Sequence, residues 1–571
     1  MKPLYTKYSN SVVDENGCLV DFSIKCPNNF NFAYDVVDEI AKQDPEKAAL
    51  VWCDVEGNEK IITFGEMSRL SSKAANFLTR KGIKKGDRVM LILKRHYEYW
   101  YTILALHKIG AIAIPATYML TPKDIIYRVQ KANISTIISA EDELISKYIT
   151  EASPECPCLK NLFNVRLDRE MFTRLDVEME TESDKFERVE TLSTDPFILY
   201  FTSGTTGYPK AVIHDYSYPL AHIITAKYWH NVEDGGLHFT VADTGWGKAS
   251  WGKIYGQWLA GSAVMVYDYE KFIADDLMDV IKKYSVTTFC APPTIYRFLA
   301  KNDLEKYDFS SVHYVTTAGE ALNPEIINRF YEVTGMEIKE GYGQTETTLL
   351  IGNLVGDIAR RGSMGKPSPL YKLKTVDNEG NDCPPGETGE IVVVPTNERK
   401  FGLCIGYDNE ESAHLRAWKN GVYHTGDMAY IDEDGYYWFI GRKDDIIKSS
   451  GYRIGPFEVE NVLMQHDAVL ECAITGVPDE ERGYVVKATI VLQKGFIPSD
   501  EMVKELQTFV KENTAPYKYP RIVEFVDQLP KTISGKIRHE AIRRKSANPD
   551  NKDTNADDNK VPELEIAGQK K

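Results

Sequence analysis

The stretch YFTSGTTGYPK, which runs from Tyr200 to Lys210, decides how the rest of the chain is interpreted. The apolar residues Phe197 to Phe201 predict a buried strand, which leads into a loop of hydroxyl groups and glycines. Glycines let backbone N–H groups approach a phosphate closely, hydroxyls donate further hydrogen bonds, and the final lysine adds positive charge. The stretch therefore predicts a phosphate-binding loop, although its spacing differs from the G-x-x-x-x-G-K-S/T pattern. A polar turn after a buried strand is the alternative.

The sequence before this loop alternates between helical and strand patterns. Apolar residues from Met67 to Leu78 recur at helical spacing. They are followed by a predicted strand at 89–93, a helix at 97–109, a strand at 111–116, a helix with Thr121 as its N-cap, and a strand at 134–139. Such alternation is typical of parallel sheets covered by helices. The predicted fold class is therefore α/β.

A second, smaller domain is predicted after the turn-rich stretch at 432–435. The residues beyond it mix strand and helix patterns, with strands expected at 468–475 and 485–492. The predicted divisions are a large N-terminal domain at 1–441, a small α+β C-terminal domain at 442–545, and a tail at 546–571. The tail is rich in Asn, Asp and Lys and poor in apolar residues, which predicts disorder.

The composition excludes several classes of protein. The chain has 571 residues, and 84 acidic against 68 basic side chains give it a formal net charge of −16. A protein this acidic is not expected to bind nucleic acid or other polyanions generally. The apolar stretch at 100–120 contains His107, Lys108 and Pro115 and is too interrupted for a membrane-spanning helix. The first residues lack the features of a targeting segment and the nine cysteines are scattered, so we expect a cytoplasmic protein.

Five segments occur in an order that resembles the adenylate-forming superfamily of acyl-CoA synthetases, peptide-synthetase adenylation domains and luciferases. They are the phosphate loop at 200–210, the adenine and magnesium segment at 340–346, the ribose segment at 423–427, the hinge segment at 441–444 and the terminal lysine segment at 530–536. The resemblance covers residues 30–545. It implies a large N-terminal domain of packed α/β subdomains, a small mobile α+β C-terminal lid, and ATP, Mg²⁺ and coenzyme A as reactants.

The resemblance also implies a set of residues that bind ATP and AMP. They are Thr202, Ser203, Gly204, Thr205, Thr206, Gly207, Lys210, Gly319, Glu320, Glu340, Gly341, Tyr342, Gly343, Gln344, Thr345, Asp427, Arg442 and Lys536. Asp427 suits hydrogen bonds from both ribose hydroxyls, and Arg442 is a fixed fork of donors for ribose or phosphate oxygens. Tyr342 offers an aromatic face to adenine. An ordinary loop carboxylate, a surface salt bridge and a core tyrosine are the alternatives for these three residues.

Catalysis is implied to depend on Lys536, Thr205 and Glu346. Thr205 and Glu346 would be the metal ligands, because a hydroxyl and a carboxylate suit a Mg²⁺ that also takes phosphate oxygens. Lys536, placed at the α-phosphate, opposes the charge that develops as a carboxylate displaces pyrophosphate. Asp444 is the implied hinge of the lid. Acetylation would remove the charge of Lys536, so a lysine acetyltransferase is a candidate regulatory partner.

Coenzyme A is expected to bind at the small domain. The implied residues are Lys448, Ser450, Gly451, Tyr452, Arg453, Arg482 and Lys511. The basic residues among them suit the phosphates of the nucleotide, and each is by itself also compatible with a solvated charge. No nucleophilic cysteine or serine of the protein is required, because acyl-AMP is already activated and the acceptor thiol belongs to the coenzyme.

Within the superfamily, the segments at 243–246, 290–296, 449–456 and 514–520 most resemble medium-chain acyl-CoA synthetases. The implied acyl pocket consists of Trp246, Lys248, Trp251 and Gly343. Acetate- and propionate-specific relatives carry Trp-Trp where this chain has Tyr342-Gly343, so the single hydrogen of Gly343 is expected to open room for a larger acyl group. Trp251 would narrow the pocket from another side, and Lys248 departs from a purely apolar tunnel.

The function predicted from these residues is an AMP-forming acid–thiol ligase for short- to medium-chain carboxylic acids, branched acids included. An aryl-acid ligase, such as one for benzoate, is the nearest alternative. A stand-alone domain that loads a carrier protein is a second alternative, and a non-catalytic nucleotide-binding protein is a third. The sequence carries no signal of an oligomeric state.

Overall fold

The structure is a computed structural model that describes residues 2–202, 209–301, 303–395, 399–450, 452–531 and 536–547. Near the N-terminus, α1 (Tyr5–Tyr8) is followed by a hairpin of β1 (Ser9–Val13) and β2 (Leu19–Ile24). Phe22 of this hairpin contacts Tyr228 edge to face, with ring centroids 6.2 Å apart. The hairpin is therefore attached to the body of the protein through its buried face.

The first large sheet has eight strands in the order β21-β11-β10-β6-β5-β7-β8-β9. Its strands are β5 (Arg88–Ile92), β6 (Ile112–Pro115), β7 (Thr136–Ser139), β8 (Asn161–Asn164), β9 (Thr173–Arg174), β10 (Pro196–Thr202), β11 (Lys210–Asp215) and β21 (Gly406–Tyr407). The helices that accompany this sheet are α3 (Phe64–Arg80), which precedes β5, and α4 (Glu98–Ile109), α5 (Pro122–Lys131), α6 (Glu143–Ala152) and α7 (Leu175–Glu178). The strands from β10 to β9 are parallel, as expected from the alternation of strands and helices.

The second large sheet has nine strands in the order β18-β17-β16-β15-β14-β12-β13-β3-β4. They are β3 (Ala48–Asp54), β4 (Glu59–Thr63), β12 (Leu237–Thr240), β13 (Ala263–Asp268), β14 (Thr288–Ala291), β15 (Tyr314–Ala318), β16 (Ile338–Tyr342), β17 (Ile351–Gly352) and β18 (Lys366–Pro367). The accompanying helices are α2 (Glu39–Gln43), α8 (Tyr218–Ile223), α9 (Gly247–Gly252), α10 (Tyr255–Leu259), α11 (Ala274–Lys283), α12 (Pro293–Lys301) and α13 (Pro324–Thr334). The strands from β3 to β16 are parallel, and antiparallel strands extend both ends.

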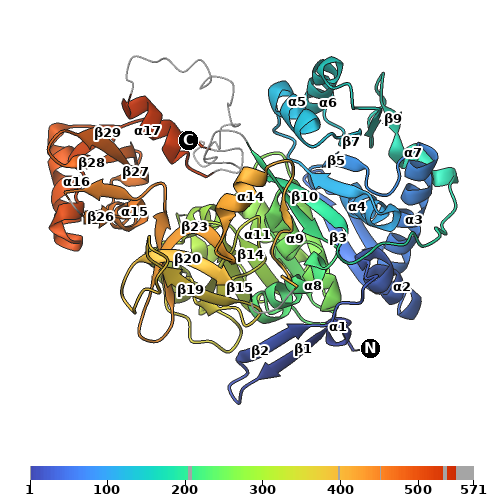
Figure 1. Cartoon of the computed structure of the whole chain (residues 1–571), viewed down its shortest axis with the longest axis horizontal. Helices are drawn as coiled ribbons and strands as arrows, with labels where there is room; N and C mark the ends of the chain where they lie inside the picture. The colour runs from blue at the N-terminus through green and yellow to red at the C-terminus, as the bar shows by residue number, and fades with distance from the viewer. Residues whose placement is uncertain are drawn as a thin grey trace.

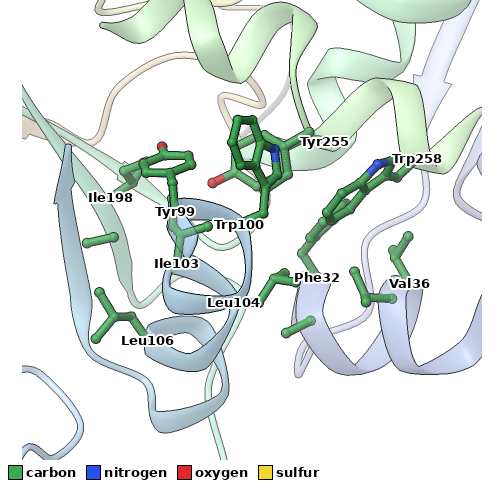
Figure 2. Packing of buried hydrophobic residues seen from close by; sticks show 14 of the residues in the cluster. Phe32, Val36, Tyr99, Trp100, Ile103, Leu104, Leu106, Ile198, Tyr255 and Trp258 are labelled. Atoms are coloured by element: carbon green, nitrogen blue, oxygen red, sulfur yellow. The ribbon is translucent and has the colours of Figure 1, made fainter. Parts of the chain in front are cut away.

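The two large sheets share an aromatic core around α4 (Figure 2). Every residue of α4 is buried, which is typical of a helix enclosed on all sides. Trp100 of this helix donates a hydrogen bond to the carbonyl of Lys253 at 2.7 Å. Phe32 stacks on Trp258 with ring centroids 6.2 Å apart, and contacts Tyr255 edge to face at 5.0 Å. This core fixes the two sheets against each other.

A third, antiparallel sheet follows in the chain. It consists of β19 (Lys372–Val376), β20 (Gly389–Val394), β22 (Trp418–Lys419), β23 (Val422–Ile431) and β24 (Tyr437–Arg442), with α14 (Glu411–Ala417) beside it. A tight turn joins β23 to β24 and pairs Asp427 with Arg442. The sequence segments named for ribose and for the hinge are therefore neighbours in one sheet.

The C-terminal part forms a separate α+β body, as the sequence predicted. It contains β25 (Ile447–Ser449), β26 (Tyr452–Ile454), β27 (Val469–Asp479), β28 (Gly483–Leu492), β29 (Ile522–Phe525), α15 (Pro456–Leu463), α16 (Asp500–Asn513) and α17 (His539–Ala547). Its own core includes Ile454, Leu463 and Leu506, which are fully buried. Figure 1 shows this body in orange and red, beside the sheet that contains β20 and β23.

The remaining helical turns are short. Two are π-helical, η1 (Ala33–Asp38) and η4 (Ile224–Trp229), and four are 3-10 turns, η2 (Ser153–Glu155), η3 (Met179–Thr181), η5 (Leu304–Lys306) and η6 (Pro516–Lys518). In the part of the chain that the structure describes, no helix has the length and apolar character needed to cross a membrane. The expected tail, apart from its first two residues, lies outside the described residues.

Candidate active site

The end of β16 faces Asp427 of β23, and the two segments form a cluster of polar groups. Both Tyr342, through its hydroxyl, and Gln344, through its Nε2, donate hydrogen bonds of 2.6 Å to Oδ2 of Asp427. Nε of Arg442 lies 3.3 Å from Oδ1 of the same carboxylate. Parallel sheets commonly bind ligands at the carboxyl ends of their strands, which is where β16 ends. The structure thus brings together the residues expected to bind adenine and ribose.

Burial and charge act in opposite directions on Asp427. The side chain is buried, which raises the pKa of its carboxyl group, while the positive charge of Arg442 lowers it. The charge of Lys536 also lowers this pKa, so Lys536 lies within electrostatic range of the cluster. The residue expected to be catalytic in the small body therefore lies close enough to the large body for its charge to act on Asp427.

A second cluster surrounds Glu346. Tyr407 of β21 donates a hydrogen bond of 3.0 Å to Oε1 of Glu346, and Nζ of Lys210 lies 5.6 Å from the centre of the Tyr407 ring. Burial raises the pKa of Glu346, and the charges of Lys210 and Arg442 oppose the shift. Sequence analysis missed Tyr407, because it lies outside the recognised segments and only the pairing of β21 with β11 brings it here.

The phosphate loop itself is only partly described. Thr202 ends β10 and Lys210 begins β11, while Ser203, Gly204, Thr205, Thr206 and Gly207 lie outside the described residues. For Mg²⁺, the described candidate ligand is the carboxylate of Glu346. Mg²⁺ at nucleotide sites commonly takes one or two carboxylates together with phosphate oxygens, so a single acidic ligand beside this loop fits the ion.

Three further residues of the expected nucleotide site lie in or beside the loop that follows β15. Gly319 follows β15 with a φ of +109°, a conformation that favours glycine. The carboxylate of Glu320 lies 3.7 Å from Arg297. Glu340 is buried and accepts a hydrogen bond of 3.3 Å from the backbone N–H of Leu322, and burial raises its pKa to about 8. The carboxyl group of Glu340 thus stabilises the loop that carries Gly319 and Glu320.

The expected acyl pocket differs from the sequence-based picture at Gly343. A Cβ atom at this position would lie 2.6 Å from Cη2 of Trp251 and 2.5 Å from the carbonyl oxygen of Thr348. The expectation that Gly343 opens room for a larger acyl group is therefore wrong at this point, because the buried indole of Trp251 fills that room. Replacing Gly343 with tryptophan would clash with the backbone rather than close a vacant pocket.

A second indole, which sequence analysis missed, supports Trp251. Trp229 contacts Trp251 edge to face at 6.0 Å, and a Cβ atom at Gly341 would lie 2.5 Å from Cζ2 of Trp229. Both glycines therefore allow an indole to approach the end of β16. The backbone of Thr345, two residues beyond Gly343, is held by a hydrogen bond of 2.7 Å between its carbonyl and Nε2 of His214.

Trp246 and Lys248 lie at the start of α9. Trp246 is half-buried, and the preceding Gly245 N–H donates a hydrogen bond of 2.8 Å to Oδ1 of Asp243. Nζ of Lys248 donates a hydrogen bond of 2.9 Å to the carbonyl of Ala318, and burial lowers the pKa of the amine. The charge of Lys536 lowers this pKa further. Lys248 therefore lies within electrostatic range of Lys536, the lysine expected to be catalytic.

The residues expected to bind coenzyme A lie on the small body. Lys448 and Arg453 are paired across the β25–β26 hairpin and are exposed. Nη1 of Arg482 donates to the hydroxyl of Ser450 at 3.3 Å, while Gly451 lies outside the described residues. Tyr452 stacks on Tyr517 with ring centroids 4.1 Å apart.

One more member of this set, Lys511, lies above the ring of Tyr519, with Nζ 4.0 Å from the ring centre. Tyr517 and Tyr519 were missed by sequence analysis, because a tyrosine carries no signal by itself. The small body thus presents basic side chains beside exposed aromatic rings, a combination that suits a nucleotide with several phosphates.

Asp444 lies in the turn that links β24 to β25. The backbone N–H of Asp445 donates to the carbonyl of Arg442 at 3.0 Å and closes the turn around Asp444. On the side of the large body, Nζ of Lys443 bonds Glu390 at 2.8 Å. On the side of the small body, Arg543 of α17 pairs with Asp445. Asp444 is exposed between these two anchored neighbours.

Comparison with known proteins gives a consistent result. The family described as AMP-binding enzyme matches residues 37–396, and the AMP-binding enzyme C-terminal domain matches residues 458–536. The chain is 40% identical to the protein named Acyl-coenzyme A synthetase ACSM3, mitochondrial, from Homo sapiens, over 92% of this chain and 91% of that protein. It is 41% identical to Acyl-coenzyme A synthetase ACSM4, mitochondrial, from Rattus norvegicus, over 90% of each protein.

A solved structure shares the fold. The anthranilate CoA ligase AuaEII, in complex with anthranoyl-AMP, superposes with a TM-score of 0.84 at 28% sequence identity, covering 91% of this chain and 98% of that chain. Its similarity extends over the large and small bodies together.

Proposed function

Because this chain belongs to the AMP-binding enzyme family and is an AMP-forming acid–CoA ligase, we propose that its substrates are short- to medium-chain carboxylic acids, branched acids included. In the first step, a carboxylate oxygen attacks the α-phosphorus of ATP, and the bond to pyrophosphate breaks. In the second, the thiolate of coenzyme A attacks the carbonyl carbon of acyl-AMP, and AMP leaves. The overall products are acyl-CoA, AMP and pyrophosphate.

The observation that best supports this two-step reaction is the electrostatic effect of Lys536 on two groups of the large body. Its positive charge acts both on Asp427, at the expected ribose position, and on Lys248, beside the expected acyl pocket. A lysine within range of both the nucleotide and the acid would stabilise the charge that develops on the α-phosphate. Glu346 and Thr205 would hold Mg²⁺, which when bound neutralises phosphate charge.

The proposed acid is limited in size by Trp251. Its indole lies against Gly343 and is backed by Trp229, so it would close the proposed pocket where a longer chain would extend. Lys248, three residues before Trp251 in α9, would add a polar group to the proposed pocket. These features support a short or branched acid over a long linear one.

An aryl acid is the second candidate. The similarity to a ligase of anthranilate favours it, because indole walls also suit a flat ring. Pyrophosphate release, measured over linear, branched and aromatic acids with ATP and Mg²⁺, tests both candidates. The highest kcat/KM with an aromatic acid would overturn the proposed substrate class.

The same assay separates the remaining alternatives. AMP release that depends on free coenzyme A supports the ligase, whereas dependence on a phosphopantetheinyl protein would indicate a carrier-loading domain. No acid-dependent pyrophosphate release would indicate a non-catalytic nucleotide-binding protein.

The two steps would use two orientations of the small body, which turns about Asp444. In one, Lys536 serves adenylation, and in the other, Lys448 and Arg453 serve thioester formation. The proposed domains remain 1–441 and 442–545. Two expectations stay predictions: control by a lysine acetyltransferase that acts on Lys536, and a cytoplasmic location. Both relatives above carry the word mitochondrial in their names.

A further inference from the structure

The first turn of α15 lies directly against β24. Phe457 contacts Phe439 of β24 edge to face, with ring centroids 5.8 Å apart and an interplanar angle of 63°. Beside this pair, a Cβ atom added at Gly455 would lie 2.5 Å from the carbonyl oxygen of Ile440 and 2.6 Å from its Cγ2. Because β24 precedes Asp444 and α15 follows it, these residues form a contact across the hinge between the two bodies.

Only this close approach explains a glycine at position 455. Its φ of −76° and ψ of 124° are extended values that any residue adopts, so backbone freedom is not the reason. On the other side of the contact, a Cβ atom at Gly441 would lie 3.4 Å from Cδ of Pro456. That distance is an ordinary van der Waals contact, so the close packing of β24 against the start of α15 depends on the glycine at position 455.

The contact exists in a defined orientation of the small body. The charge of Lys536 acts on Asp427 and Lys248, both of which belong to the large body. Asp445, immediately after the hinge, pairs with Arg543 of α17, the helix that begins three residues beyond Lys536. The contact of α15 with β24 and the approach of Lys536 to the nucleotide cluster thus occur together.

We propose that Gly455 and Phe457 are positioning residues that hold the small body in the orientation for adenylation, and that their contact with Ile440 and Phe439 opens before thioester formation. The inference rests on the proposed function, since a two-step ligase is what needs two orientations. A contact made in only one of two states shifts the equilibrium toward that state and has no effect within the other.

Gly455→Ala tests the proposal most directly. Its methyl group meets a backbone carbonyl, and overpacking of this kind is large enough to disfavour the docked orientation by about tenfold or more. ATP–pyrophosphate exchange is expected to fall at least about tenfold, while conversion of synthetic acyl-AMP to acyl-CoA stays within about twofold of the wild type. Phe457→Ala, which removes contact without a clash, should show a smaller shift in the same direction.

Gly476→Ala is the matched control. The nearest atoms to a Cβ there are Cγ2 of Ile447 and Cδ1 of Tyr484, both in the small body and both 3.3 Å away. It should affect the two half-reactions equally. Hydrogen exchange of the peptide 437–442 gives a readout that is independent of catalysis, and it should be faster in Gly455→Ala than in the wild type or Gly476→Ala.

The proposal would be overturned if folded Gly455→Ala and Phe457→Ala lost both half-reactions equally. Unchanged hydrogen exchange of the 437–442 peptide in Gly455→Ala would also overturn it. Its failure is distinguishable from failure of the proposed function. If the wild type performs neither half-reaction, the function is wrong, and hydrogen exchange at β24 still decides whether the contact exists.

Discussion

Glu340 shows how burial alone changes the behaviour of a single side chain. Its carboxyl group is buried against the backbone N–H of Leu322, and burial raises its pKa from 4.5 to about 8. At neutral pH the folded protein therefore keeps a proton on Glu340, whereas the unfolded chain releases it above about pH 4.5. The contribution of this group to folding is therefore complete below about pH 4.5, where both states are protonated, and is lost as the pH rises toward 8.

The stability of the protein is expected to fall between about pH 4.5 and pH 8 through this group. The folded state binds one more proton than the unfolded state in that window, so the free energy of unfolding drops by up to about 1.4 kcal/mol per pH unit. Glu340→Gln, which keeps an acceptor for Leu322 and cannot ionise, should flatten this slope in urea unfolding. The exposed Glu433→Gln serves as the control. An unchanged slope in Glu340→Gln would assign the pH dependence to another group.

Trp251 is the residue for which substrate size gives the clearest test. Trp251→Ala removes the indole that lies against Gly343, so longer or bulkier acids should gain in kcat/KM. Each additional buried CH₂ contributes about 0.8 kcal/mol, which is about fourfold in specificity. The measurement is kcat/KM over acids of increasing length, with Trp438→Ala, in the β23–β24 hairpin, as control. The same length profile in both variants would show that Trp251 does not bound the acyl pocket.

At the scale of elements, α5 shows where the sequence suffices. Thr121 and Pro122 predict the start of this helix, and the structure has Thr121 as N-cap in a complete capping box with Asp124. Thr121→Ala should lower the free energy of unfolding by about 0.5–2 kcal/mol, because backbone N–H groups at the helix start lose their acceptor. Chemical denaturation measures this loss, and kcat/KM should stay unchanged. A fall in activity without a loss of stability would show that this helix has a role in catalysis.

The elements also show where prediction from sequence fails. Strands, helices and caps follow from neighbouring residues, so β5 and β10 lie within one residue of the expected bounds and α3 contains the predicted helical pattern. The room beside Gly343 depends on a distant helix that carries Trp251, and the partner of Glu346 is Tyr407 on another strand. Such contacts depend on how the sheets pack against each other. No local pattern in a single sequence encodes that packing. The motifs therefore predicted the chemistry of the site better than the shape of its pocket.

At the scale of the whole molecule, the proposed active site is shared between two bodies. The large body would contribute Asp427 from β23 and Glu346 from the turn after β16, and Arg442 ends β24 at the proposed domain boundary. The small body contributes Lys536 and, on its β25–β26 hairpin, Lys448 and Arg453. If the small body kept one fixed orientation, with Lys536 at the proposed site, this hairpin would stay away from a bound acyl-AMP. Each half-reaction should therefore depend on different residues of the small body.

Separate assays of the two half-reactions test this division. Lys536→Ala should lower ATP–pyrophosphate exchange by about two to three orders of magnitude, the usual effect of removing one group that stabilises a transition state. It should still convert synthetic acyl-AMP to acyl-CoA. Lys448→Ala should show the opposite pattern, with normal exchange and slower thioester formation, and the exposed Lys494→Ala should change neither. Normal exchange in Lys536→Ala would remove this lysine from catalysis, and equal losses in both variants would mean that the small body works in one orientation only.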